Sequence, residues 1–152
     1  MTQIITFDPA LDKNKHLVKK LSDVCIKISE SNDTLAKNYN NTRFIFTDNI
    51  AITIVLNEED EIIMFATLYQ NEFYGNKCAR TMNRTWKAPS IRKENALWKN
   101  IDNRKFFYGP DIIASHILIA KEKNIDQVFI SIEGGAHRYS KYLCSILEEK
   151  TE

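Results

Sequence analysis

Two apolar runs separated by a short polar turn constrain the fold of this chain more than any other feature. The run IAITIVL spans residues 50–56, and the run EIIMFATLY spans residues 61–69. Both are rich in the β-branched and aromatic side chains that favour strands, whereas the NEED sequence at residues 57–60 is typical of a turn. The pattern predicts a β-hairpin of two antiparallel strands about this turn.

Three further strands are expected around this hairpin. Residues Cys78–Trp86 alternate in polarity until Pro89 stops the pattern, so they should pair beside residues 61–69. The sequence TQIITF near the N-terminus also reads as a strand, and QVFISIE, which starts at Gln127, reads as a buried one.

Helices are predicted on both sides of the hairpin. From Leu11 to Ile28, apolar residues recur every three or four positions while lysines fill other positions, which indicates an amphipathic helix. Gly109, Pro110 and Asp111 form a typical helix start, and the helix should run to Asn124. We expect its Ile112, His116, Ile119 and Ala120 side to face the sheet. A closing helix should follow the turn at residues 134–135.

This order of elements predicts the fold class. Strand, helix, three antiparallel strands, helix, strand and helix indicate an α+β fold, with a mostly antiparallel mixed sheet flanked by helices. The length of 152 residues fits a single domain over 1–152.

We expect a cytoplasmic protein, because the N-terminus lacks the pattern of a signal peptide and no apolar run is long enough to span a membrane. Three cysteines without a C-x-x-C pattern predict neither disulfides nor a metal site.

Charge is unevenly distributed along the chain. Residues 77–105 contain nine Lys or Arg against two acids, although the whole chain has a net charge of only +1. This asymmetry predicts an anionic ligand near the middle of the chain. On a strand, Arg80, Met82, Arg84 and Trp86 would share one face, which suits a groove for phosphate and a flat ring. The alternative is a solvated basic strand whose charges are neutralised by acids elsewhere.

The element order and two motifs resemble the GNAT N-acetyltransferase superfamily. The motifs are NRTWKAPSIR, a basic strand that ends in a Pro-x-x-Arg turn, and ILIAKEKNIDQVFISIE, a helix followed by a strand. In this form they are similar to the GNAT-like proteins of large tailed phages. The resemblance implies that the first strand splays from its neighbour to bind the pantetheine of acetyl-CoA, and that the next helix binds the pyrophosphate. The cofactor-binding residues implied are Arg84, Thr85, Trp86, Lys87, Arg92, Gly109 and Asp111.

The sequence departs from the superfamily pattern at two places. No glycine-rich turn follows Arg92, since Gly109 is the next glycine, and the final β-hairpin of the full fold is not found after the last predicted helix. We therefore expect a divergent, C-terminally truncated member, in which either a second copy in a homodimer covers the open edge of the sheet or the acceptor-side wall of the cleft is absent.

Three residues near the C-terminus are candidates for catalysis. Glu133 ends a predicted strand beside the opening of the sheet and could deprotonate an amine through a water molecule. Tyr139 and Tyr142 lie on the closing helix, where GNAT enzymes often keep a tyrosine that reprotonates the thiolate. Helix capping for Glu133, and packing for the tyrosines, are the structural alternatives. His116 is interpreted as a hydrogen-bonded core residue.

Two functions follow from these features. The first is transfer of an acetyl or related acyl group from a CoA thioester to an amine acceptor. The second is a non-catalytic protein of the same fold, whose basic groove binds nucleic acid or an acidic protein.

Overall fold

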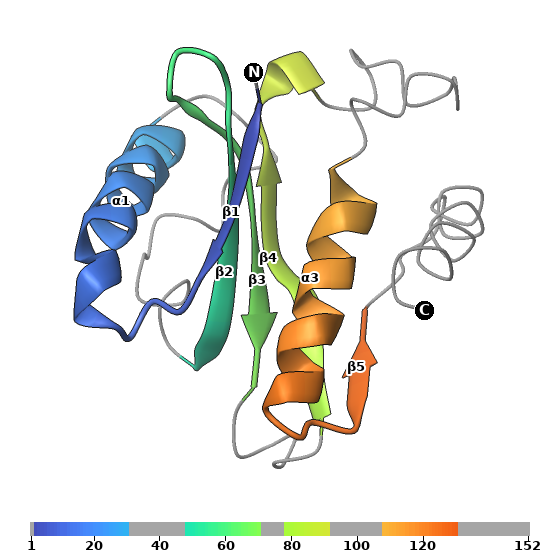
Figure 1. Ribbon diagram of the computed structural model, residues 1–152. Helices are drawn as coiled ribbons and strands as arrows, with labels where there is room; N and C mark the ends of the chain where they lie inside the picture. The colour runs from blue at the N-terminus through green and yellow to red at the C-terminus, as the bar shows by residue number, and fades with distance from the viewer. Residues whose placement is uncertain (1, 31–47, 71–77, 92–107, 131–152) are drawn as a thin grey trace.

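A five-stranded sheet forms the centre of the part of the computed structural model that is described, namely residues 2–30, 48–70, 78–91 and 108–130 (Figure 1). The sheet has the strand order β1-β2-β3-β4-β5. The elements are β1 (Gln3–Phe7), α1 (Lys15–Glu30), β2 (Asn49–Leu56), β3 (Ile62–Tyr69), β4 (Cys78–Lys87), α3 (Gly109–Glu122) and β5 (Gln127–Phe129), with 3-10 turns at Asp12–Asn14 and Pro89–Ile91.

Strands β1 to β4 pair with one another in antiparallel order, and β5 is parallel to β4. A parallel pair needs a crossover connection, which α3 provides here. The predicted α+β fold, with a mostly antiparallel mixed sheet flanked by helices, is therefore confirmed. The closing helix, the segment 92–107 and the predicted end of the last strand lie outside the described residues.

The hairpin between β2 and β3 forms at the predicted turn. Ile54 pairs with Phe65 in the antiparallel register, and the turn is closed by a bond from the Asn57 amide to the Glu61 carbonyl at 3.0 Å. The Asn57 side chain, through Oδ1, accepts bonds from the Glu59 and Glu61 amides at 3.0 and 2.9 Å. This use of an asparagine side chain explains locally why the chain turns here.

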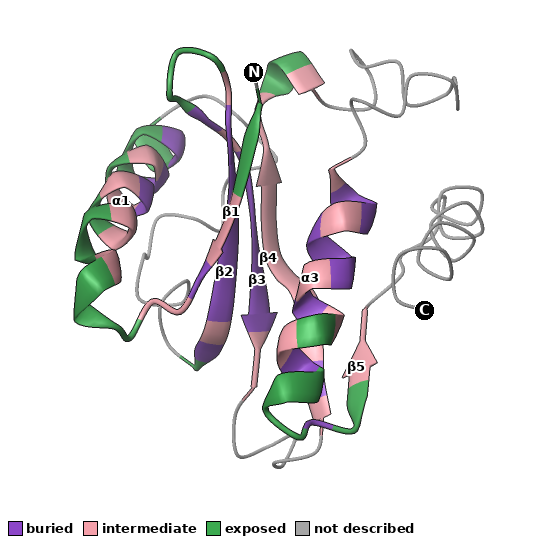
Figure 2. Cartoon of the chain, viewed as in Figure 1, coloured by how far each residue is buried: buried purple, intermediate pink, exposed green. Residues whose placement is uncertain are grey.

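Helix α1 packs on one face of the sheet. Its Leu21, Cys25 and Ile28 are buried in a cluster with alternate residues of the strands, among them Ile54 and Phe65. Lys15 and Lys19 of α1 are exposed, and Figure 2 shows the outer side of this helix as largely exposed. Burial of each large apolar side chain in this layer contributes roughly 1.5–3 kcal/mol to the stability of the fold.

Helix α3 packs on the opposite face of the sheet. Ile112 lies with Val55, Met64 and Ala66, which alternate along β2 and β3 with the residues that face α1. Ile112, His116 and Ala120 are buried, and Ile119 is half-buried and packs against the same cluster as Val128 of β5. The predicted inner face of this helix is confirmed. The helix also ends as predicted, because Asn124 has the left-handed φ of 60° that terminates helices.

Candidate active site

Strand β4 is distorted in its middle by a bulge. Leu68 pairs with Thr81 and Ala66 pairs with Thr85, so two steps along β3 correspond to four along β4. Met82 lies within this bulge and has a φ of 57°. A left-handed φ at a non-glycine residue costs about 1–3 kcal/mol, and such strain occurs preferentially at functional sites.

The bulge changes which side chains share a face of β4. Met82 packs with Met64 and Ile112 on the α3 side of the sheet, whereas Trp86 packs with Phe65 on the α1 side. The prediction that Arg80, Met82, Arg84 and Trp86 line one face is therefore wrong for Met82. The physical reason is that the extra residues of the bulge break the two-residue alternation of an ordinary strand.

The outer edge of β4 pairs with β5 in a parallel arrangement. Within the described residues, the parallel pairing covers Cys78–Arg80 of β4 and Gln127–Phe129 of β5. The amide of Ala88 bonds the Ile63 carbonyl of β3 at 2.8 Å, so the alternation of a strand directs the amides of Thr85 and Lys87 away from β3. The amides of Thr85 and Lys87 therefore point to the outer edge of β4, which is the edge that pairs with β5.

The start of α3 lies beside this half of β4. Met82 and Ile91 pack against the same cluster as Tyr108 and Ile112, which joins the end of β4 to the first turn of the helix. Tyr108 is the N-cap residue and provides no side-chain hydrogen bond to the first turn. The first-turn amides of a helix can bind an anion such as a phosphate.

The predicted cofactor-binding residues fall into three groups. Arg84, Thr85, Trp86 and Lys87 are on β4, and Gly109 and Asp111 are in the first turn of α3, with Gly109 buried and Asp111 half-buried. The Trp86 ring stacks on Phe65 on the α1 side, at 6.0 Å between centroids, whereas Gly109 and Asp111 belong to α3 on the opposite face. Arg92 and the predicted catalytic residues Glu133, Tyr139 and Tyr142 lie outside the described residues.

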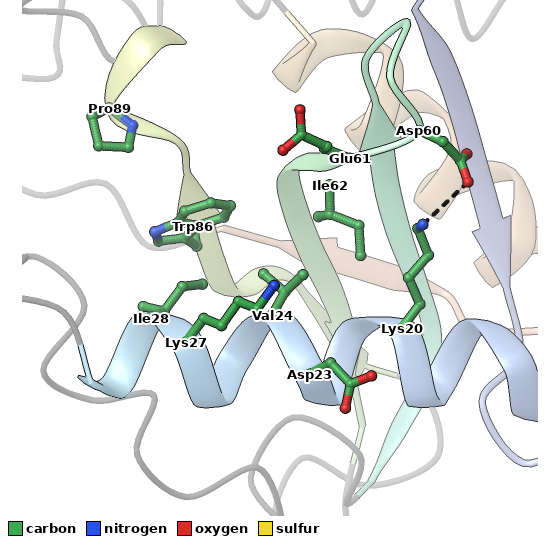
Figure 3. A pocket seen from close by; sticks show the side chains of 10 residues that line it. All are labelled: Lys20, Asp23, Val24, Lys27, Ile28, Asp60, Glu61, Ile62, Trp86 and Pro89. Carbon is green, nitrogen blue, oxygen red and sulfur yellow. Dashed lines mark hydrogen bonds and ion pairs between the residues drawn. The ribbon is translucent and has the colours of Figure 1, made fainter.

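A pocket of about 500 Å³ opens on the α1 side of the sheet (Figure 3). Lys20, Asp23 and Lys27 of α1 form one wall, and Asp60 and Glu61 of the hairpin form another. The apolar lining comes from Val24, Ile28, Ile62, Trp86 and Pro89. Sequence reasoning missed this pocket, because its walls come from segments about 40 residues apart and no motif links them.

A hydrogen-bonded histidine connects α3 to the sheet. His116 is fully buried; its Nε2 lies 2.9 Å from Thr53 Oγ1 of β2, and its Nδ1 lies 2.7 Å from Thr81 Oγ1 of β4. Desolvation lowers the pKa of His116 from its usual value of 6.5 to about 4. The ring is therefore neutral near pH 7, and the interpretation of His116 as a hydrogen-bonded core residue is confirmed.

The described residues contain neither a candidate metal site nor a helix that could span a membrane. Residues 2–30, 48–70, 78–91 and 108–130 contain no group of three or more His, Cys, Asp or Glu side chains placed to hold a metal ion. None of the helices in those same ranges is long and apolar enough to cross a membrane.

Comparisons with known proteins place this architecture among acetyltransferases. No family model matches the sequence, and a search of curated proteins finds no match. A probable acetyltransferase from Staphylococcus epidermidis superposes with a TM-score of 0.57 at 16% identity, covering 96% of this chain and 82% of the other. An acetyltransferase of the GNAT family from Staphylococcus aureus Mu50 gives a TM-score of 0.52 at 12% identity, covering 95% and 82%. AAC(6')-Iy in complex with the bisubstrate analogue CoA-S-monomethyl-acetylneamine gives 0.52 at 11% identity, covering 96% and 89%. The chain therefore has the GNAT acetyltransferase fold.

Proposed function

We propose that this chain is a GNAT N-acyltransferase that moves an acetyl or related acyl group from a CoA thioester to an amine. The observation that carries the proposal is the position of β4, whose bulge at Met82 packs beside the start of α3. The likeness of the fold to solved acetyltransferases supports the proposal.

The described residues fit a CoA thioester at this place. The amides of Thr85 and Lys87 point to the outer edge of β4 and would bind the pantetheine arm. The first turn of α3, at Gly109 and Asp111, would bind the pyrophosphate through backbone amides and the positive end of the helix dipole. Arg84 and Arg92 would add positive charge near the phosphates.

Residues of this chain would then position the two substrates and exchange protons with them. When bound, the thioester supplies the acyl group: the amine nitrogen bonds to the carbonyl carbon, the C–S bond breaks, and the thiol leaves with a proton. Glu133 would accept the proton of the amine through a water molecule, and Tyr139 or Tyr142 would donate a proton to the sulfur. These three roles, the homodimer and the cytoplasmic setting stay predictions.

The backbone contact can be tested with a matched pair of variants. Thr85→Pro removes the amide hydrogen on the outer edge of β4, whereas Thr85→Ala keeps that hydrogen and loses the same side-chain bond to the Met82 carbonyl. We expect Thr85→Pro to weaken desulfo-CoA binding about fivefold relative to Thr85→Ala, because one hydrogen bond contributes about 1 kcal/mol. Isothermal titration calorimetry measures both affinities, and circular dichroism checks that both variants fold.

Activity is tested by incubating the protein with acetyl-CoA and a panel of primary amines. Release of free thiol together with an acetylated amine, detected by mass spectrometry, is the expected result. If the wild type binds single-stranded DNA but neither acetyl-CoA nor desulfo-CoA, the acyltransferase proposal is wrong and the alternative of a binding protein is favoured.

A further inference from the structure

The pocket on the α1 side adjoins the same half of β4 as the proposed cofactor site. Trp86 and Pro89 line the pocket, while the start of α3 lies against Met82 and Ile91 on the other side of the sheet. Direct acyl transfer requires both substrates to meet at one place. The second half of β4 is the described element that both sites share, so a molecule in the pocket approaches it from the face opposite α3.

Charges of opposite sign stand on the two walls of the pocket. Lys20 and Lys27 extend from α1, and Asp60 and Glu61 belong to the hairpin (Figure 3). The ion pair between Lys20 Nζ and Asp60 Oδ2, at 3.2 Å, joins the walls at one end and neutralises both charges. Asp23 is likewise neutralised by Lys19 at 3.3 Å.

One cation and one anion remain for a ligand. Lys27 forms no ion pair with any residue that the structure describes. Glu61 receives a single described side-chain bond, from Asn57 Nδ2 to Oε1 at 3.3 Å, and its carboxylate keeps capacity for a further donor. A polyanion would be repelled by the hairpin wall and a polycation by Lys27, so the charges favour a molecule that carries both signs.

The base of the pocket is apolar and partly aromatic. Trp86 is held by its stack on Phe65, and Val24 and Ile62 pack in the same cluster. A volume of about 500 Å³ lies in the range of small-molecule sites, roughly 300–1,000 Å³. The pocket therefore suits the side chain of a large apolar amino acid.

We propose that this pocket binds the amine acceptor as a free α-amino acid with a large apolar side chain. Its ammonium group lies toward Glu61, its carboxylate toward Lys27, and its side chain on Trp86. The role of acceptor rests on the proposed acyltransferase function, but binding of the zwitterion does not, so binding is tested without CoA.

The first test compares three probes of the same shape by calorimetry. L-Phenylalanine carries both charges, phenethylamine lacks the carboxylate, and 3-phenylpropionate lacks the ammonium group. We expect L-phenylalanine to bind at least fivefold more tightly than either analogue. Because the chain has two tryptophans, a Trp98→Phe background leaves Trp86 as the reporter, and its fluorescence should change as L-phenylalanine binds.

Charge variants then test which wall of the pocket binds which charged group of the amino acid. Lys27→Met should lower the affinity for L-phenylalanine about fivefold and leave that for phenethylamine unchanged, because only the carboxylate loses its partner. Glu61→Gln should weaken binding of L-phenylalanine and of phenethylamine and leave that of 3-phenylpropionate unchanged. Lys13→Met, at an exposed lysine that does not line the pocket, is the matched control and should change none of these affinities.

Several results would overturn the inference. They are equal affinity for the three probes, tighter binding of phenethylamine or spermidine than of L-phenylalanine, or a loss in Lys13→Met as large as in Lys27→Met. If the protein acetylates other amines but does not bind L-phenylalanine, this inference is wrong and the proposed function stands. If it binds L-phenylalanine as expected but neither binds desulfo-CoA nor releases thiol, the pocket stands and the acyltransferase proposal is wrong.

Discussion

His116 shows how a single buried side chain ties a helix to two strands. Its ring bridges Thr53 and Thr81, which lie on β2 and β4 with β3 between them. In the neutral ring one nitrogen donates and the other accepts, so both threonine hydroxyls are satisfied. Thr81 also lies at the edge of the bulge in β4, so the histidine fixes the strand next to this irregularity.

The low pKa of His116 makes the free energy of unfolding depend on pH. The folded-state pKa is about 4 and the ordinary value is 6.5, so the unfolded chain binds a proton first as the pH falls. Stability from this group is complete above pH 6.5 and is lost as the pH falls toward 4, by about 2 kcal/mol at pH 5. Urea unfolding at pH 7 and pH 5 should show this excess loss in the wild type relative to His116→Gln. Equal losses in both proteins would contradict the assignment.

At the level of elements, Asp111 sets two effects against each other at the start of α3. An acid in the first turn stabilises a helix by about 0.3–1 kcal/mol through the helix dipole. The same negative charge repels a phosphate that binds to the first-turn amides. We therefore expect Asp111→Asn to lower the free energy of unfolding by that amount and to tighten desulfo-CoA binding severalfold.

The control for this prediction is Asp126→Asn, an exposed acid beyond the end of α3. Calorimetry with desulfo-CoA and thermal unfolding should show no comparable changes in it. Unchanged or weaker binding in Asp111→Asn would mean that the pyrophosphate does not lie at the start of α3.

Local patterns in the sequence predict some elements of this fold and not others. The hairpin follows from two β-branched runs and the Asn57 turn, and the inner face of α3 follows from the spacing of Ile112, His116 and Ala120. The bulge at Met82 could not be predicted, because it depends on the register between β4 and β3 rather than on residues near Met82. The pocket was missed for a similar reason, since Lys27 and Glu61 line the same pocket only after the helix has packed on the sheet.

At the scale of the whole molecule, the sheet separates the pocket from the proposed cofactor site, and β4 adjoins both. Helix α1 and the pocket lie on one face of the sheet and α3 lies on the other, and β4 contributes Trp86 to the first layer and Met82 to the second. This arrangement lets a CoA thioester and an amine approach β4 from different sides. Its consequence is that cofactor contacts should be concentrated on β4 and α3, away from β1.

Hydrogen exchange with and without desulfo-CoA tests this claim most directly. We expect slower exchange of backbone amides in the second half of β4, especially at Thr85 and Lys87, and in the first turn of α3. Amides of β1 should exchange at the same rate in both conditions and serve as the internal control. Saturating desulfo-CoA without protection of Thr85 and Lys87 would contradict the proposal that this edge of β4 binds a CoA thioester.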